Sequence, residues 1–223
     1  MEEVSATNAG QTSIDSWGSD AATTTHSSER IVKLFASASQ DKGAYHVFNP
    51  VKTLREELGD LMLYGHCDKA NDLIFTHARH GVLLVADDDG RQPLHVACQL
   101  GLTGIACTML DLGSPLVDAD KDGNQPLHIA CKNSLSSVAL AMLHAKQEVP
   151  IHDRNKYGDQ PLHIACAKGL EEVVMLMVEM GAKLDAKDQA ERQAVHLACK
   201  FGHDRLVITI INAKVRGCNT VPY

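Results

Sequence analysis

Between residues 87 and 199, the order of apolar and polar positions repeats with a nearly constant period. Pro-Leu-His begins at 93, 126 and 161, and the related Ala-Val-His begins at 194. These starting positions lie 33, 35 and 33 residues apart. A fixed period of this length indicates one supersecondary unit that is copied and stacked.

Within each period, apolar residues recur at the three-and-four spacing that is typical of short helices. After a turn, the pattern predicts an inner helix over 93–100 and an outer helix over 103–112, closed by Gly113. The repeated segments are DDDGRQPLHVAC (87–98), DKDGNQPLHIAC (120–131), NKYGDQPLHIAC (155–166) and DQAERQAVHLAC (188–199).

This order of a turn, a Pro-Leu-His-x-Ala helix and a Val/Leu-rich helix resembles the ankyrin repeat, over roughly residues 57–215. The resemblance implies an all-α fold, an ankyrin-repeat solenoid built from helix-turn-helix units joined by β-turns. We expect a capping helix and a degenerate repeat at 45–86, and a C-terminal tail at 216–223 without a polar capping helix. The four full repeats are expected at 87–119, 120–153, 154–187 and 188–215.

The leading unit is read from its own apolar pattern. Asn49-Pro50 is typical of a helix cap followed by the first helical residue. Gly65-His66 resembles the turn in the middle of an ankyrin repeat, and residues 73–75 fit the second helix. The buried stripe of the first helix is expected at Leu54, Leu58, Leu61 and Met62.

The repeats depart from the family's pattern in three places. The second repeat has Ser134 and Lys146 where the family has glycine, and two extra residues with Pro150, so we expect an irregular joint there. The fourth repeat has Glu191 in place of its turn glycine. The family's usual Thr before Pro-Leu-His is Gln at 92, 125, 160 and 193, a poorer helix cap whose longer amide is expected to reach the histidine.

Residues 1–44 differ in composition from the rest of the chain. Ser, Thr, Ala, Gly and Asn dominate them, so they predict a disordered N-terminal tail. Within this tail, residues 29–35 have apolar positions at helical spacing. They predict either a short docking helix or a transient one.

The composition of the chain limits which partners it can bind and in which compartment it is expected. A formal net charge of −7 over 223 residues disfavours nucleic acid and anionic membranes as partners. The first residues carry no secretory signal, and the longest apolar run, 173–178, is too short to cross a bilayer. Seven cysteines, four of them at one repeated position, predict a reducing compartment, cytoplasmic or nuclear.

Histidine and cysteine recur three residues apart on each predicted inner helix, at 95 and 98, 128 and 131, 163 and 166, and 196 and 199. Packed helices lie about 8–10 Å apart, so copies of one position cannot converge on one zinc ion. We therefore expect structural roles for all eight residues. A second candidate is a zinc site formed by His66, Cys67, His77 and His80, although this spacing matches no standard zinc module.

Motifs of catalysis are absent from the sequence. There is no Gly-x-Ser-x-Gly, no His-Glu-x-x-His, no phosphate-binding loop and no dinucleotide-binding turn. We expect no enzymatic activity within this chain, no metal, no cofactor and no small-molecule substrate.

The resemblance implies that a protein partner binds the concave surface formed by turn tips and inner helices. The first tip is acidic and bases gather toward the other end. Charges on turns are ordinarily only solvated, and the graded sign makes electrostatic orientation of the partner the alternative interpretation. Tyr157 is the expected anchor, and Lys156 and Arg154 beside it favour an acidic partner segment. The candidate binding residues are Asp87, Asp88, Asp89, Arg91, Lys121, Asp122, Asn124, Lys132, Arg154, Lys156, Tyr157, Asp159, Lys168, Lys187, Arg192, Lys200 and Phe201.

The function expected is therefore non-catalytic protein–protein binding, as an adaptor or inhibitor. One alternative is the regulatory ankyrin part of a larger enzyme or channel, since the apolar last outer helix, 206–211, calls for a further neighbour. Another is a transcription-factor regulator similar to the inhibitor-of-NF-κB proteins, although Trp17 interrupts the resemblance of residues 15–19 to their degradation signal.

Overall fold

The computed structural model describes residues 50–77 and 81–218. The predicted tail at 1–44, the predicted helix at 29–35, the cap residue Asn49 and the histidine at 80 lie outside these described residues. Within them, residues from 51 onward form one compact unit. That unit is helical, with short connectors between the helices.

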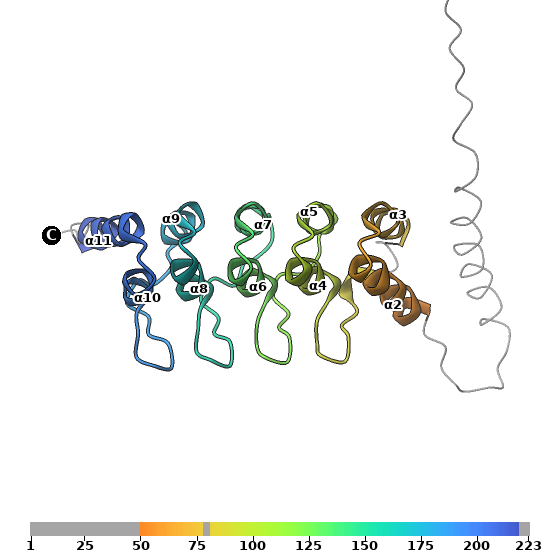
Figure 1. Cartoon of the computed structure of the whole chain (residues 1–223), viewed down its shortest axis with the longest axis horizontal. Coiled ribbons are helices and arrows are strands. Elements are labelled where there is room, and N and C mark those ends of the chain that lie inside the picture. The colour runs from red at the N-terminus through yellow and green to blue at the C-terminus, as the bar shows by residue number, and fades with distance from the viewer. Residues whose placement is uncertain (1–49, 78–80, 219–223) are drawn as a thin grey trace, which may run out of the picture. The chain divides into compact units, whose positions relative to one another are not determined.

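Helices in this unit form two rows, one of inner helices and one of outer helices, as Figure 1 shows. The first pair is α2 (Pro50–Leu63) and α3 (Cys67–His77), and a 3-10 turn, η2 (Val82–Leu84), leads to the repeats. The inner row continues with α4 (Pro93–Leu100), α6 (Pro126–Lys132), α8 (Pro161–Lys168) and α10 (Ala194–Lys200). The outer row continues with α5 (Thr103–Asp111), α7 (Ser136–Leu143), α9 (Glu171–Glu179) and α11 (Asp204–Cys218).

These bounds agree closely with the periodicity of the sequence. Helix α4 spans the predicted residues, and α5 ends one residue before the predicted Leu112. The prediction of a tail from residue 216 is wrong, because α11 continues to Cys218. The reason is local: residues 212–216 are all compatible with a helix, and the first proline after α11 begins stands at 222.

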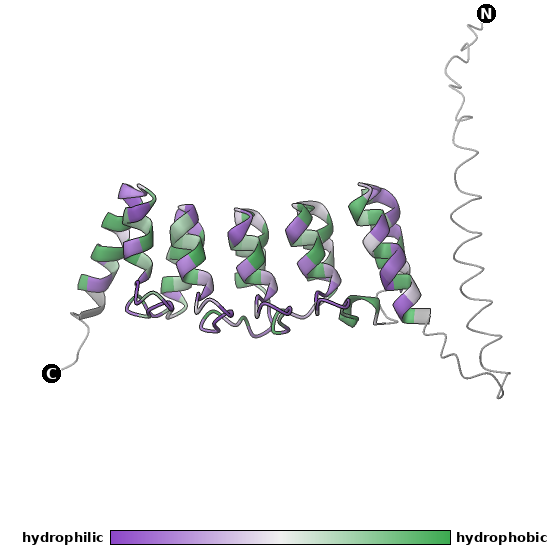
Figure 2. Ribbon diagram, turned by 60° about the horizontal axis from the view of Figure 1, so that its bottom comes forward, coloured by the Kyte–Doolittle hydropathy of each residue, from purple (hydrophilic) through white to green (hydrophobic). Residues whose placement is uncertain are grey.

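The core lies between the two rows of helices and repeats from pair to pair. Leu94, Leu127 and Leu162 on the inner helices are fully buried. Met109 on α5 is fully buried too, and so are its equivalents Met142 and Met177. Full burial of a Leu or Met side chain stabilises the fold by about 1.5–3 kcal/mol, so these repeated core residues together contribute a large part of the favourable free energy of folding. Hydrophilic residues gather on the turns, as Figure 2 shows.

The leading pair belongs to the same core. Leu54, Leu58 and Met62 of α2 are buried, whereas Leu61 is only half-buried, so its place in the predicted stripe is wrong. A helix position next to a fully buried one turns by about 100°, and Met62 takes the buried direction instead. The turn at residues 65–66 falls between α2 and α3, as predicted.

Each turn between repeats is closed by the side chain of its first residue. Asp120 Oδ1 accepts hydrogen bonds from the backbone N–H groups of Asp122 and Asn124, at 2.9 and 2.7 Å. The first residues of the other turns, at 87, 155 and 188, accept the equivalent pair of bonds. The fourth turn keeps this geometry although Glu191 replaces its glycine, at a φ of 60°. We call these four turns, 87–91, 120–124, 155–159 and 188–192, the tips.

Neighbouring tips are hydrogen-bonded to one another. The Lys121 N–H donates to the Asp89 carbonyl at 2.9 Å, and the Lys156 N–H donates to the Asp122 carbonyl at 2.9 Å. Gln189 Nε2 donates to the Lys156 carbonyl at 2.6 Å, which joins the fourth tip to the third. The tips are therefore one continuous, ordered edge rather than four independent loops.

Histidine connects each of the inner helices α4, α6 and α8 to the next repeat. His95 Nδ1 accepts from the backbone N–H of Gln92 at 3.2 Å, and its Nε2 donates to the Asn124 carbonyl at 3.2 Å. His128 and His163 make the equivalent pairs of bonds. Burial lowers the pKa of all three imidazoles, which keeps them neutral and leaves the proton on Nε2.

The glutamine before each Pro-Leu-His or Ala-Val-His has a role that the sequence did not predict. The amide Nε2 of Gln92 donates to Asp118 Oδ2 at 2.6 Å, and that of Gln125 donates to Asp153 Oδ2 at 2.7 Å. It is the backbone N–H of the glutamine that bonds the histidine ring, so the expected amide–histidine contact is wrong. The longer side chains of Gln92 and Gln125 instead reach forward to the connector before the next tip.

The second repeat, which lacks the two glycines usual in the family, is stabilised by other residues. Ser134 takes the left-handed conformation, at a φ of 58°, that glycine takes at the same place in the first and third repeats. After α7, Gln147 Nε2 donates to the Ser114 carbonyl at 2.7 Å and so ties the longer connector to the preceding repeat.

Candidate protein-binding surface

One surface of this unit combines the inner helices with the tips, and we call it the inner face. Three hollows lie along it, of about 290 Å³ between α2 and α4, 450 Å³ between α4 and α6, and 200 Å³ between α8 and α10. An aliphatic side chain from the fourth residue of each repeat's inner helix lines these hollows: Val96, Ile129, Ile164 and Leu197. The inner face is thus an open surface with an aliphatic floor.

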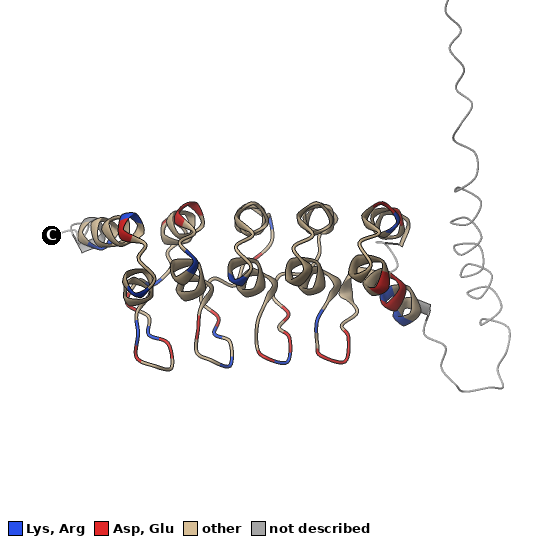
Figure 3. Ribbon diagram, viewed as in Figure 1, with Lys and Arg blue, Asp and Glu red and all other residues tan. Residues whose placement is uncertain are grey.

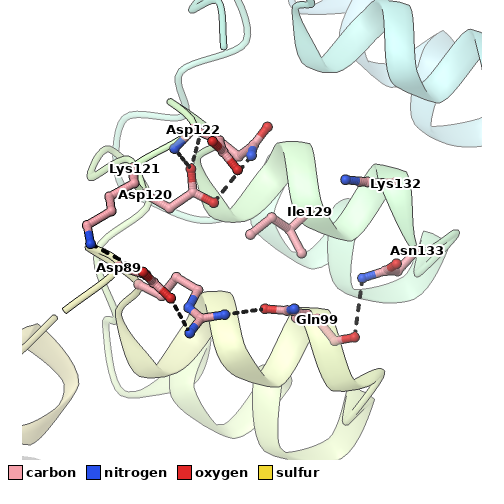
Figure 4. A pocket seen from close by; sticks show the side chains of 10 residues that line it. Asp89, Gln99, Asp120, Lys121, Asp122, Ile129, Lys132 and Asn133 are labelled. Carbon is pink, nitrogen blue, oxygen red and sulfur yellow. Dashed lines mark hydrogen bonds and ion pairs between the residues drawn. The ribbon is translucent and has the colours of Figure 1, made fainter. Parts of the chain in front are cut away.

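The middle hollow is rimmed by a network of charged and amide groups, drawn in Figure 4. Arg91 donates to Asp89 Oδ2 at 2.8 Å and to Gln99 Oε1 at 3.2 Å. Lys121 Nζ lies 3.3 Å from the other oxygen of Asp89. On the opposite rim Asn133 Nδ2 donates to the Cys98 carbonyl at 3.0 Å, which joins α6 to α4. This network holds the rim in place before any partner arrives.

Several charged residues that were predicted to bind a partner serve the tips themselves. Asp87 pairs with Arg55 at 2.9 Å and with Arg91 at 3.0 Å, and its side chain is only 13% exposed. Burial raises the pKa of Asp87, but hydrogen bonds from Arg91 and the charges of Arg91 and Arg55 outweigh it and leave the pKa below its usual value. Asp87 is therefore part of the scaffold of the first tip.

Three other residues that were predicted to bind a partner also stabilise the tips or join neighbouring repeats. Arg154 donates to the Gly158 carbonyl at 2.9 Å and to the Lys187 carbonyl, so it closes one tip and joins it to the next repeat. Asn124 is buried and accepts a bond from Asn155 Nδ2 at 3.0 Å. Arg192 pairs with the buried Asp188 at 2.8 Å.

The remaining cations at the tips are paired with carboxylates. Lys156 lies 3.9 Å from Asp122, and Lys187 lies 2.6 Å from Glu191. All four side chains are more than half exposed, so solvent screens both pairs and they contribute little to stability. Asp159 is half-buried beside the third hollow, where burial raises its pKa.

Two aromatic side chains stand on this surface. Tyr157 is 60% exposed at the third tip, where its backbone N–H donates to Asn155 Oδ1. Phe201 is 54% exposed after α10 and borders the third hollow, with Lys200 Nζ 5.5 Å from its ring centre. Exposed aromatic rings next to bases are common among residues that dominate protein–protein binding.

Charge changes along the row of inner helices: α2 carries acidic residues, and α6, α8 and α10 carry basic ones, as Figure 3 shows. Glu56 and Asp60 of α2 border the first hollow, and Asp88 is exposed at the first tip. At the other end Lys132, Lys168 and Lys200 are exposed. The sequence reading missed the acidic residues of α2, because it took only the buried stripe from that helix. Their polar positions between the leucines were the available signal.

The recurring thiols do not form a reactive or metal-binding set. Cys98, Cys131 and Cys166 are fully buried. Burial, with a smaller contribution from Cys107, raises the pKa of Cys98 to about 12, and burial alone raises that of Cys166 to about 12. Cys199, which was grouped with them in the sequence, is exposed, because no described residue stacks beyond α10 at this position.

The second zinc candidate is wrong. Cys67 begins α3 and His77 ends it, so about ten residues of helix, roughly 15 Å, separate the two side chains. Zinc requires its ligands within about 2.3 Å of one ion, so these residues cannot meet. Across the described ranges 50–77 and 81–218, no three His, Cys, Asp or Glu side chains are placed to hold a metal.

The lengths and compositions of the described helices show whether any of them could span a membrane. Among them, none is both long enough and apolar enough to cross a bilayer. The longest, α11, has 15 residues and carries Asp204, Arg205 and Lys214.

Stacked helix pairs, a repeated core and a hydrogen-bonded edge of tips define a helical repeat protein, a class that acts through its extended surface. A family model for ankyrin repeats, in three copies, matches residues 60–153 and 142–220. The chain therefore belongs to the ankyrin-repeat family, whose repeats are protein–protein interaction modules and generally non-catalytic. A comparison with curated proteins gave no match.

Proposed function

We propose that this chain is a non-catalytic binding module that holds a segment of a partner protein along the inner face, as an adaptor or inhibitor. The observation that carries the proposal is the row of three hollows over an aliphatic floor, bordered by the tips. A protein segment that follows this row would bury apolar side chains in the hollows and meet polar groups at the rim, the usual composition of an interface.

Fixed geometry supports this proposal. The tips are hydrogen-bonded to one another, and the rim groups of the middle hollow are bonded to their neighbours. A partner that binds such a surface orders few additional side chains, so less conformational entropy opposes binding.

Photo-crosslinking in cells tests the position of the interface. A benzoylphenylalanine placed at Tyr157 or Asn133 on the inner face is expected to capture the partner. The same group at Ser137 or Lys146, on or just after the outer helix α7, serves as the matched control. Capture of one protein mainly from the control positions would refute the proposed location.

A second candidate function is regulation of a larger enzyme or channel, through contact at α10 and α11. His196 and Cys199 are exposed, although their equivalents in the earlier repeats are fully buried. Ile208 and Ile211 of α11 are 60% and 50% exposed. A crosslinker at 208 or 211 that captures a protein, while the inner-face positions capture none, would favour this candidate.

A further inference from the structure

Three lysines stand at equivalent ends of three consecutive inner helices. Lys132 ends α6, Lys168 ends α8 and Lys200 ends α10. All three side chains are exposed, and in the part of the chain that the structure describes none of them forms an ion pair. They form a row along the basic half of the inner face, and we call them the lysine row.

The lysine row differs from the cations of the tips. Lys121, Lys156 and Lys187 each lie within 4 Å of a carboxylate, so their charges are locally compensated. The lysines of the row have no ion-pair partner among the described residues, and the partial negative charge of a helix end, roughly half a unit, compensates each of them only in part. An approaching carboxylate therefore meets these charges without first breaking an ion pair.

Spacing relates the lysine row to an extended peptide. Packed helices lie about 8–10 Å apart. A chain in the polyproline II conformation has about three residues per turn and advances about 3.1 Å per residue, so every third side chain lies on one face. Three residues then cover about the distance from one inner helix to the next. We propose that the segment recognised on the inner face is a peptide in the extended polyproline II conformation, with a carboxylate at every third residue, one for each lysine of the row. This inference rests on the proposed function.

Two other features of the inner face limit where such a peptide binds. Asp60 and Asp88 repel carboxylates from the α2 end, so the peptide lies over α6, α8 and α10. Between Lys168 and Lys200, the third hollow presents Ile164, Leu197 and Phe201, which favours an apolar side chain between two of the carboxylates.

Two peptides of identical composition test the spacing. The spaced peptide is acetyl-Gly-Asp-Ser-Leu-Asp-Leu-Ser-Asp-Gly-amide, which reads the same in both directions. The clustered control is acetyl-Gly-Leu-Ser-Asp-Asp-Asp-Ser-Leu-Gly-amide. When the full chain is titrated at low salt, fluorescence anisotropy of the labelled peptide is expected to show up to about fivefold tighter binding of the spaced peptide, since one further exposed pair contributes up to about 1 kcal/mol.

Charge reversal locates the contact. Lys132→Glu, Lys168→Glu and Lys200→Glu are each expected to weaken binding of the spaced peptide by about fivefold or more, and to reduce its salt dependence. Lys146→Glu and Lys214→Glu are exposed, make the same change in net charge, and lie after α7 and on α11. These controls are expected to leave binding within about twofold.

Each other result overturns the inference. Equal binding of the two peptides, no binding of either, or equal effects of row and control reversals would contradict it. Tighter binding of a helical peptide with acids at every seventh residue would contradict it too, because seven helical residues also advance about 10 Å. If crosslinking still places a partner on the inner face after such a result, the proposed function stands and only the acidic spacing is refuted.

Discussion

Replacing Gly169 by alanine tests how closely consecutive repeats fit together. Gly169 follows α8 at a φ of +70°, and a Cβ added there would lie 2.6 Å from Cε1 and Nδ1 of His203. His203 Nε2 donates to the Ala167 carbonyl at 3.1 Å, a bond that connects the third repeat to the fourth. Alanine at 169 must displace this imidazole and break that bond.

The first repeat provides a matched control. Gly101 has nearly the same φ, +74°, but a Cβ added there would have no atom within 4 Å. Gly101→Ala therefore adds only the left-handed backbone strain, about 1–2 kcal/mol. Gly169→Ala adds this strain and the loss of the His203 bond, about 1 kcal/mol more. We expect Gly169→Ala to reduce the free energy of unfolding by about 2–3 kcal/mol.

Urea unfolding followed by far-ultraviolet circular dichroism measures both variants. The His203→Ala change made in each background completes a double-mutant cycle, and it should reduce the cost of Gly169→Ala but leave that of Gly101→Ala unchanged. Equal costs for the two glycine substitutions, or no effect of removing His203, would refute the contact between Gly169 and His203.

Three further predictions concern protonation, thiols and the irregular joint. The buried histidines at 95, 128 and 163 have lowered pKa values, so below about pH 6.5 the unfolded chain binds more protons than the folded one and stability falls. The midpoint of urea unfolding should therefore be constant above about pH 7 and fall as the pH drops through about 6.5. A midpoint that stays constant down to about pH 5 would contradict this. Cys199 should react with a thiol reagent far faster than the buried thiols at 98, 131 and 166, as peptide mass spectrometry would show, and equal rates would contradict the burial. Ser134→Gly should raise the free energy of unfolding by about 1 kcal/mol, because the residue already has a φ of 58°, and a loss of stability would contradict that conformation.

Most of the fold could be predicted from the sequence because the repeated motif marks where each unit begins. Pro-Leu-His marks the start of an inner helix three times, and the fourth start follows from the period alone. The end of α11 was not predictable in this way, since no later copy marks it. The role of Gln92 was also missed, because Asp118, the acceptor of its amide, lies 26 residues away and only the fold brings the two together.

The candidate site was less predictable than the fold. Asp87 lies in the first tip and Arg154 directly before the third, but a charged residue at such a position has two possible uses: contact with a partner or closure of the tip. The difference lies in long-range contacts, Arg55 against Asp87 and Arg154 against the Lys187 carbonyl. By contrast, the lysines at the helix ends have no such neighbours among the described residues, and their exposure follows from the helical pattern alone.

A repeat position acquires its properties from the unit that follows it. His163 and His196 stand at the same place in nearly the same segment, and each accepts a bond from the preceding glutamine N–H. His163 also donates to the Ala186 carbonyl and is fully buried, whereas His196 is exposed. The same histidine thus joins two repeats inside the stack, whereas in the last described repeat its Nε2–H is exposed and can donate a hydrogen bond to another molecule. Residues that look equivalent in the sequence therefore divide into scaffold and surface only when their neighbours are known, and this chain offers two such surfaces, the inner face and the end formed by α10 and α11.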